Sequence, residues 1–221
     1  AGVVAASGGN HGAGVAYAAT KLGHKSKIFV PRAIAKEEKL RRMRDFGAEI
    51  VLTEGSVADC MDEYAAYAKS SGALAVHPYD TAPTLTGQGT VAREFDTQVP
   101  GLDTVLISVG GGGLIGGVAA WCAGHIKVVA VENHLTNTLS LSMDQGPDID
   151  VRASGIAASS LGGPALGVLP YQIAKTHIHT HVLVDDADVF DAGQRLWGAT
   201  RLVGAPGAAT ALGHRFRRSR R

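Results

Sequence analysis

The stretch TVLISVGGGGLIGGVAAWCAGHIKVVAV, residues 104–131, constrains the fold more than any other part of the chain. An apolar run leads into four glycines, Gly110–Gly113, which open a helical pattern that is followed by a second apolar run. Two short strands joined by a helix pair in parallel, because the helix carries the chain back to the end of the sheet at which it started. The stretch therefore predicts an α/β fold, in which a parallel sheet is covered by helices on both faces.

The rest of the chain alternates strands and helices in the same way. We expect strands at Val3–Ala6, Lys27–Val30, Glu49–Leu52, Leu74–His77, Thr104–Val109, Lys127–Val131 and His181–Val184. We expect helices at His11–Leu22, Ala35–Phe46, Ala58–Ser70, Gly87–Thr97, Leu114–Ala123, Leu169–Lys175 and Ala187–Leu202, with loops over 144–167. The polar, proline-containing segment His77–Pro83 is typical of a crossing between two lobes, which we place at residues 1–84 and 85–221.

Residues Gly110–Gly113 form a candidate phosphate site. The first N–H groups of a helix have no partner within it, the helix dipole adds partial positive charge, and missing side chains let an anion come close. The spacing of Gly111, Gly113 and Gly116 also fits the dinucleotide pattern G-x-G-x-x-G, with Glu132 placed to bind a ribose. A compact phosphate monoester fits the uninterrupted run at least as well, so the residues alone leave both ligands open.

A second loop of this kind stands near the start of the chain, in AASGGNHGAGVAYAA. Residues 7–12 place glycines, an asparagine and a histidine between a small-residue strand and an alanine-rich helix. A turn from strand to helix needs only one glycine and a cap, so this composition indicates a binding loop. A carboxylate at the start of the helix would meet N–H donors that lack partners.

Composition limits the classes of function. With 19% charged residues and a formal net charge of +1, the chain offers no overall electrostatic attraction to nucleic acid or to a membrane surface. No apolar run approaches the length of about 18 residues typical of a membrane span. Cys60 and Cys122 lie in helical patterns and are expected to be buried free thiols. These features predict a cytoplasmic protein.

The motifs SGGNHG and VGGGGLIGGVA together resemble those of the threonine/serine dehydratase family of pyridoxal-phosphate enzymes, which share the fold of the tryptophan synthase β subunit (fold type II). The segments VPRAIAKEEKLRRMRDFGAEIVL and VHPYDTAPTLTGQGTVARE resemble the family in order and spacing, and SGIAASSLGGPALG and RLVGAPGAATALG resemble it more loosely. The resemblance implies a two-lobed, three-layer αβα architecture with parallel sheets. Residues 1–84 would form the small lobe with the substrate loop, and 85–221 part of the large lobe that binds the cofactor phosphate.

The resemblance also implies a cofactor, a substrate and site residues. The cofactor would be pyridoxal 5′-phosphate, and the substrate L-threonine or L-serine, converted to a 2-keto acid and ammonia. The matching cofactor positions are Asn10, beside the pyridine ring and bonded to its 3-oxygen, and Gly110, Gly111, Gly112, Gly113 and Leu114 at the phosphate. The matching substrate positions are Ser7, Gly9, Asn10 and His11 at the carboxylate, with Gln88 at the mouth of the cleft.

Several positions depart from the family or from its racemase members. Gly8 stands where racemases of this fold carry a serine acid–base, and glycine has no side chain to transfer a proton, which favours elimination over racemisation. In several relatives a glutamate, a carbonyl and an aspartate bind a divalent cation. Glu132 and Thr136 match that pattern, but Thr138 replaces the aspartate. We therefore expect no metal site, and Glu132 facing solvent.

The family holds its cofactor as a Schiff base on a lysine, in a segment like S-x-K-x-R-G-A upstream of the SGGNHG loop. None of the eight lysines lies in such a segment, so we assign no catalytic residue. Ala205 stands where the family pattern V-x-E-P-x-G-A carries a glutamate, and the ending GHRFRRSRR departs from the family. We expect a fragment truncated at both ends and inactive by itself, with the arginine run 215–221 as a solvated tail.

The sequence is thus compatible with three functions. The first is a pyridoxal-phosphate-dependent ammonia-lyase that acts on a small amino acid and assembles as a homo-oligomer. The second is half of an NAD-dependent oxidoreductase, with Gly111–Gly116 at the dinucleotide. The third is a non-catalytic module that binds an amino acid through residues 7–12.

Overall fold

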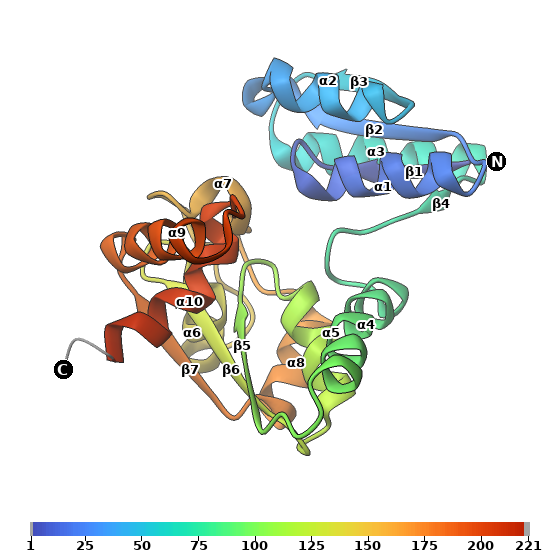
Figure 1. Cartoon of the computed structure of the whole chain (residues 1–221). Coiled ribbons are helices and arrows are strands. Elements are labelled where there is room, and N and C mark those ends of the chain that lie inside the picture. Colours follow the sequence, from blue (N-terminus) through green and yellow to red (C-terminus); the bar gives the residue numbers. More distant parts are fainter. Residues whose placement is uncertain (1, 219–221) are drawn as a thin grey trace. The chain divides into compact units, whose positions relative to one another are not determined.

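The computed structural model of the protein describes residues 2–218, which divide into two compact units, one up to Pro78 and one from Tyr79 on (Figure 1). The boundary expected at residue 84 falls inside helix α4 (Ala82–Gln98), which belongs entirely to the second unit. The last part of the arginine run, predicted to be a solvated tail, lies outside the described residues. Within residues 2–218, no helix is both long and apolar enough to cross a membrane.

The first unit is built on a four-stranded parallel sheet with the order β3-β2-β1-β4. Its strands are β1 (Val3–Ala6), β2 (Ser26–Pro31), β3 (Ala48–Thr53) and β4 (Leu74–Ala75). Its helices are α1 (Asn10–Lys21), the 3-10 turn η1 (Arg32–Ile34), α2 (Glu37–Asp45) and α3 (Val57–Ser71).

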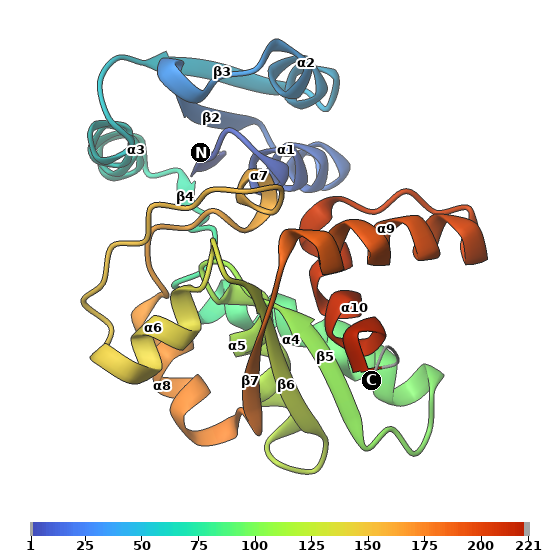
Figure 2. The same ribbon diagram turned by 90° about the vertical axis from the view of Figure 1, so that its left-hand side faces the viewer.

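Alternate residues of these strands face opposite layers of helices. On one face, Ala5 and Ile28 pack in a core with Ala16 of α1 and Met43 of α2. On the other face, Val4 and Phe29, together with Cys60 and Tyr64 of α3, form a second core. Figure 2 shows α1 and α3 on either side of this sheet. The unit is therefore a three-layer αβα sandwich, as expected for strands buried on both faces.

The second unit repeats this architecture around a three-stranded parallel sheet with the order β5-β6-β7 (Figure 2). Its strands are β5 (Thr104–Ser108), β6 (Lys127–Asn133) and β7 (Thr180–Val184). Its helices are α4, α5 (Gly113–Cys122), α6 (Thr138–Gln145), α7 (Ala158–Leu161), α8 (Val168–His177), α9 (Asp186–Thr200) and α10 (Pro206–Arg218). One core packs α4, α5 and α8 against the sheet, and another packs α9 and α10 against the opposite face.

The predicted strands and helices are all present, and the α/β fold class is confirmed in both units. Helix α4 begins at Ala82 rather than Gly87, because Pro83 stands in its first turn, where a missing N–H costs nothing. Cys60 and Cys122 are free and buried, as predicted. Helices α6 and α10 and the short α7 were not among the expected helices.

Helix α6 depends on a residue that precedes it in the sheet. Glu132, near the end of β6, is completely buried, and its carboxylate accepts hydrogen bonds from the N–H groups of Leu139 at 2.7 Å and Ser140 at 2.8 Å. These donors lie in the first turn of α6 and have no partner within the helix. The prediction that Glu132 faces solvent was wrong, because the carboxylate caps a helix that the local sequence did not reveal.

Burial of Glu132 also affects its protonation. Loss of hydration raises the pKa of Glu132 to about 7, although the N–H groups of Ser140 and Leu139 favour the charged form. The pKa of this carboxyl is thus higher in the folded than in the unfolded chain. Its contribution to stability is therefore complete below the unfolded pKa and is lost as pH rises through about 7.

Glu132→Gln tests this assignment, because glutamine cannot ionise and offers only one acceptor oxygen to the two N–H groups. We expect the variant to be less stable than the parent at pH 5, in denaturant unfolding monitored by circular dichroism. Because ionisation destabilises only the parent, the difference in unfolding free energy should shrink by about 2–3 kcal/mol between pH 5 and pH 8. A difference that stays constant over this range would contradict a raised pKa.

Helices α4 and α5 are in contact through glycine. A β-carbon at Gly117 of α5 would collide with the backbone of α4, at the carbonyl of Leu85 and, at 2.6 Å, the nitrogen of Gly89. We expect Gly117→Ala to lower the free energy of unfolding by about 2–3 kcal/mol, since neither backbone atom can move aside alone.

Gly87→Ala is the matched control. It makes the same substitution in α4, at a position where a β-carbon would meet nothing within 4 Å. Alanine favours a helix over glycine, so this variant should gain about 0.5–1 kcal/mol. Equal destabilisation of both variants would show that close helix packing at Gly117 is not the cause.

Candidate functional site

The glycine loop follows directly from a buried strand of the second unit. We define it as Gly110–Gly113, which follows β5 and ends at the first residue of α5. Val109 still belongs to the sheet, since its N–H donates to the carbonyl of Val131 at 3.2 Å. Gly112 then caps α5 with a φ of +90°, a conformation that favours glycine. The first N–H groups of α5 therefore lie at the carboxyl end of the sheet.

The carbonyl oxygens of the glycine loop are held by hydrogen bonds, while its N–H groups are free. The donor–acceptor pairs are Thr138 Oγ1 to Gly110 O at 2.6 Å, Gly167 N to Gly111 O at 3.1 Å, and Gly116 N to Gly112 O at 2.8 Å. Within the described residues, the N–H groups of Gly111, Gly112 and Gly113 donate to no acceptor. In a trans peptide the C=O and N–H bonds point in opposite directions, so each anchored carbonyl directs the next N–H away from its anchor.

The back of the loop leaves no room for side chains. A β-carbon at Gly111 would overlap the ring of Tyr79, and one at Gly112 would lie 2.5 Å from Leu166. One at Gly110 would approach the backbone of Leu161 at 3.1 Å. Glycine is therefore required for the loop to turn between these neighbours and keep its N–H groups open.

These features fit the phosphate of the cofactor that the family implies. Successive free N–H groups and the positive end of the α5 dipole bind an anion, and no residue of the sequence GGGGL at 110–114 carries a charge. Leu114, the second residue of α5, adds one further N–H without a helical partner. The site suits a compact dianion bound through the backbone.

The loop at residues 7–12 lies in the first unit, where it follows β1 and includes the first turn of α1. Gly9 is the N-cap of α1 and no side chain caps the helix. The first helical bond is that of Ala13 N to Gly9 O at 3.3 Å, so the N–H groups of Asn10, His11 and Gly12 have no helical partner. Ser7 Oγ accepts from Gly9 N at 3.2 Å. This helix start also suits an anion.

The side chains at the start of α1 differ in their surroundings. Asn10 is exposed. His11 is half-buried, with Nε2 at 3.0 Å from the carbonyl oxygen of Val76, to which it donates. Burial lowers the pKa of His11, more than the bond to Val76 raises it, and the nearby His77 lowers it further. His11 is thus a neutral ring that ties α1 to the segment after β4.

Gln88 lies on α4 of the second unit, where the backbone of α5 comes close at Gly117. A surface groove of about 480 Å³ runs along α4, α5 and α8 of this unit. The groove is lined by Ala82, Leu85, Thr86, Gly89, Thr90, Arg93, Gly117, Ala120, Trp121, Leu169 and Ile173. It includes none of the site residues predicted from the sequence.

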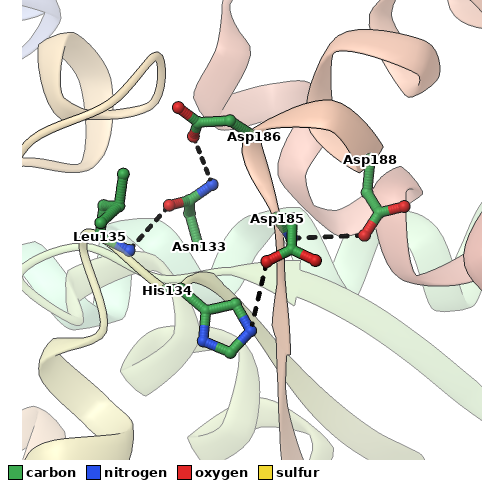
Figure 3. A network of polar contacts seen from close by, with 6 residues as sticks. All are labelled: Asn133, His134, Leu135, Asp185, Asp186 and Asp188. Atoms are coloured by element: carbon green, nitrogen blue, oxygen red, sulfur yellow. Dashed lines mark hydrogen bonds and ion pairs between the residues drawn. The ribbon is translucent and has the colours of Figure 1, made fainter.

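A polar network holds together the turns that follow β6 and β7 (Figure 3). The buried Asn133 donates to Asp186 Oδ1 at 2.8 Å and accepts from the N–H of Leu135 at 2.8 Å. His134 Nε2 lies 3.6 Å from Asp185 Oδ1, and the N–H of Asp185 donates to Asp188. The contacts of Asn133 with Asp186 and of His134 with Asp185 fix the start of α9 beside the end of β6. Sequence reasoning missed these two contacts because they join residues about 50 positions apart.

Glu132 is not available to a ribose, since both carboxylate oxygens accept from the start of α6. This removes the acidic residue that the dinucleotide interpretation requires. Among the described residues, no group of three or more His, Cys, Asp or Glu side chains is arranged to hold a metal ion.

Comparison with known proteins agrees with the fold. The chain is 31% identical over 205 residues to an L-threonine ammonia-lyase of Geobacter sulfurreducens, covering 91% of this chain and 51% of that protein. It is 33% identical to the biosynthetic L-threonine dehydratase of Salmonella typhimurium, covering 96% of this chain and 41% of that protein. The chain thus spans about half the length, or less, of these curated relatives.

A solved structure and a family model also match the chain. The processed form of threonine deaminase isoform 2 from Solanum lycopersicum superimposes with a TM-score of 0.87 at 27% identity, covering 96% of this chain and 62% of that one. The family described as pyridoxal-phosphate dependent enzyme matches residues 1–220. The chain therefore belongs to the pyridoxal-phosphate-dependent enzymes.

Proposed function

We propose that this chain supplies the phosphate- and carboxylate-binding parts of a lyase that converts L-threonine or L-serine into a 2-keto acid and ammonia. The observation that carries the proposal is the row of free N–H groups at Gly111, Gly112 and Gly113, each directed by an anchored carbonyl. The names of the relatives, L-threonine ammonia-lyase and L-threonine dehydratase, support the substrate class. Because the chain spans only part of those proteins, the activity is proposed for the protein that contains it.

The chain's own residues would bind and orient the reactants. Gly110–Gly113 and Leu114 would hold the phosphate through backbone N–H groups. Asn10 is exposed, so its amide is free to lie beside the cofactor ring and to bond its 3-oxygen. When bound, pyridoxal phosphate supplies a conjugated ring that delocalises the electron pair left behind as the α-proton departs.

The loop at residues 7–12 would position the substrate. Ser7, Gly9, Asn10 and His11 would receive its carboxylate at the start of α1, with Gln88 at the mouth of the site. A neutral His11, whose Nε2–H is already donated to Val76, is suited to shaping the loop and not to transferring protons. Gly8 offers no acid–base group, which favours elimination over racemisation.

We place the protein in the cytoplasm, as a homo-oligomer with a small-molecule amino-acid substrate and no nucleic-acid partner. The NAD-dependent alternative is not favoured, since Glu132 is engaged at α6 and the family match is to pyridoxal-phosphate enzymes. A module that binds an amino acid without a cofactor is also not favoured, because the family match is to enzymes that depend on a cofactor.

Binding of pyridoxal 5′-phosphate, compared with pyridoxal, tests the proposal. We expect saturable quenching of tryptophan fluorescence by the phosphate ester, at least about tenfold tighter than by pyridoxal, since a bound dianion adds several charge-assisted hydrogen bonds. Inorganic phosphate should compete. Quenching by NADH and not by pyridoxal 5′-phosphate would support the NAD-dependent oxidoreductase. Binding of L-threonine without cofactor, measured by calorimetry, would support the non-catalytic module.

The reaction class is tested in the protein that contains this chain. We expect it to form 2-keto acid from L-threonine or L-serine without accumulation of the D-enantiomer, because Gly8 cannot protonate the opposite face of the substrate. Chiral chromatography of the remaining amino acid provides the measurement. Accumulation of D-serine at a rate equal to elimination would contradict this assignment of Gly8.

A further inference from the structure

Thr138 touches the glycine loop from outside it. It is the first residue of α6, and it is completely buried. Its hydroxyl lies 2.6 Å from the carbonyl oxygen of Gly110. Of the three carbonyl oxygens in the loop that are anchored, Gly110 O is bonded to a side chain, whereas Gly111 O and Gly112 O are bonded to backbone N–H groups. A point substitution at Thr138 can therefore remove one anchor without altering the backbone.

The position of Thr138 is itself set by Glu132. The carboxylate accepts from the next two N–H groups of α6, those of Leu139 and Ser140. Glu132 Oε1 is 3.4 Å from Thr138 Oγ1, compared with 2.6 Å for the carbonyl of Gly110. A hydroxyl has one proton to donate, and the shorter contact identifies Gly110 as its acceptor. The carboxylate thus fixes the start of α6, and the hydroxyl connects α6 to the loop.

This bond determines the direction of an N–H group. The carbonyl of Gly110 and the N–H of Gly111 belong to one peptide plane and point in opposite directions. Holding the carbonyl toward α6 therefore turns the N–H of Gly111 away from α6. Glycine imposes little restriction on that plane by itself, so without the hydroxyl the N–H would sample other directions. The partly buried carbonyl would also lose its hydrogen-bond partner.

We propose that Thr138 is a positioning residue of the phosphate site, whose hydroxyl orients the N–H of Gly111 toward the bound phosphate through the carbonyl of Gly110. The inference rests on the proposed function, because it assumes that the loop binds the phosphate of the cofactor. It adds a role for a residue that stands where the family's metal-binding pattern has an aspartate. Here that position bonds the loop directly through its hydroxyl.

Thr138→Val and Thr138→Ser test this role in the full chain. Valine keeps the shape of threonine but lacks the donor, whereas serine keeps the donor. We expect Thr138→Val to weaken binding of pyridoxal 5′-phosphate about tenfold, since one partly buried hydrogen bond is lost and the N–H of Gly111 is no longer oriented. Binding of pyridoxal, which has no phosphate, should stay unchanged. Thr138→Ser should bind both compounds within about threefold of the parent.

Thr210→Val is the matched control. Thr210 is also completely buried, and its hydroxyl donates to the carbonyl of Pro206 at 3.0 Å, within α10. Loss of this hydroxyl should lower the stability of the fold without changing the ratio of affinities for pyridoxal phosphate and pyridoxal. Thermal unfolding of each variant shows whether the fold persists. Should Thr138→Val not fold, Thr138→Cys replaces it, since a thiol is a weak donor of similar size.

The outcomes separate this inference from the proposed function. If the parent does not prefer pyridoxal phosphate over pyridoxal, the proposed function fails and the inference fails with it. If the parent does prefer it, and a folded Thr138→Val or Thr138→Cys keeps the same preference, the inference alone is overturned. The positioning role is established if Thr138→Val loses the preference for pyridoxal phosphate over pyridoxal. Thr138→Ser and Thr210→Val must both keep that preference.

Discussion

Hydrogen bonds to the carbonyl oxygens of Gly110, Gly111 and Gly112 govern what the glycine loop can bind. A run of glycines is flexible by itself, and its N–H groups could face any direction. Each anchored carbonyl fixes one peptide plane and turns the next N–H away from the anchor. The result is a row of free donors at the start of α5, which needs no charged side chain to attract a phosphate.

The two units use the same arrangement for two anions. In each, a buried parallel strand ends in a glycine-rich loop, and a helix with no side-chain cap begins immediately afterwards. At α1 the free N–H groups are those of Asn10, His11 and Gly12, which suit a carboxylate. At α5 the free groups extend back into the glycine loop, which suits a dianion. Under the proposed function, the loop at α5 binds the cofactor phosphate and the loop at α1 binds the substrate carboxylate.

Local sequence predicted the parts of this structure that depend on local interactions. The strand, glycine run and helix at 104–123 follow from apolar periodicity and from the freedom of glycine, and they form as expected. Helix α6 could not be predicted in this way, because its cap is Glu132 on the preceding strand and not an adjacent residue. The bond from Thr138 to Gly110 joins residues 28 apart, so it became visible only in the folded chain. That Asn10 and the glycine loop serve one cofactor rests on the resemblance and remains a prediction.

The central claim is that the N–H groups of Gly111, Gly112 and Gly113 bind the phosphate, and backbone amide NMR of the ¹⁵N-labelled chain tests it most directly. On titration with pyridoxal 5′-phosphate, these three amide resonances should show the largest downfield proton shifts of the second unit, because they form hydrogen bonds to a dianion. Pyridoxal should leave them in place. The account is contradicted if pyridoxal 5′-phosphate binds and shifts other amides while those of the glycine loop do not move.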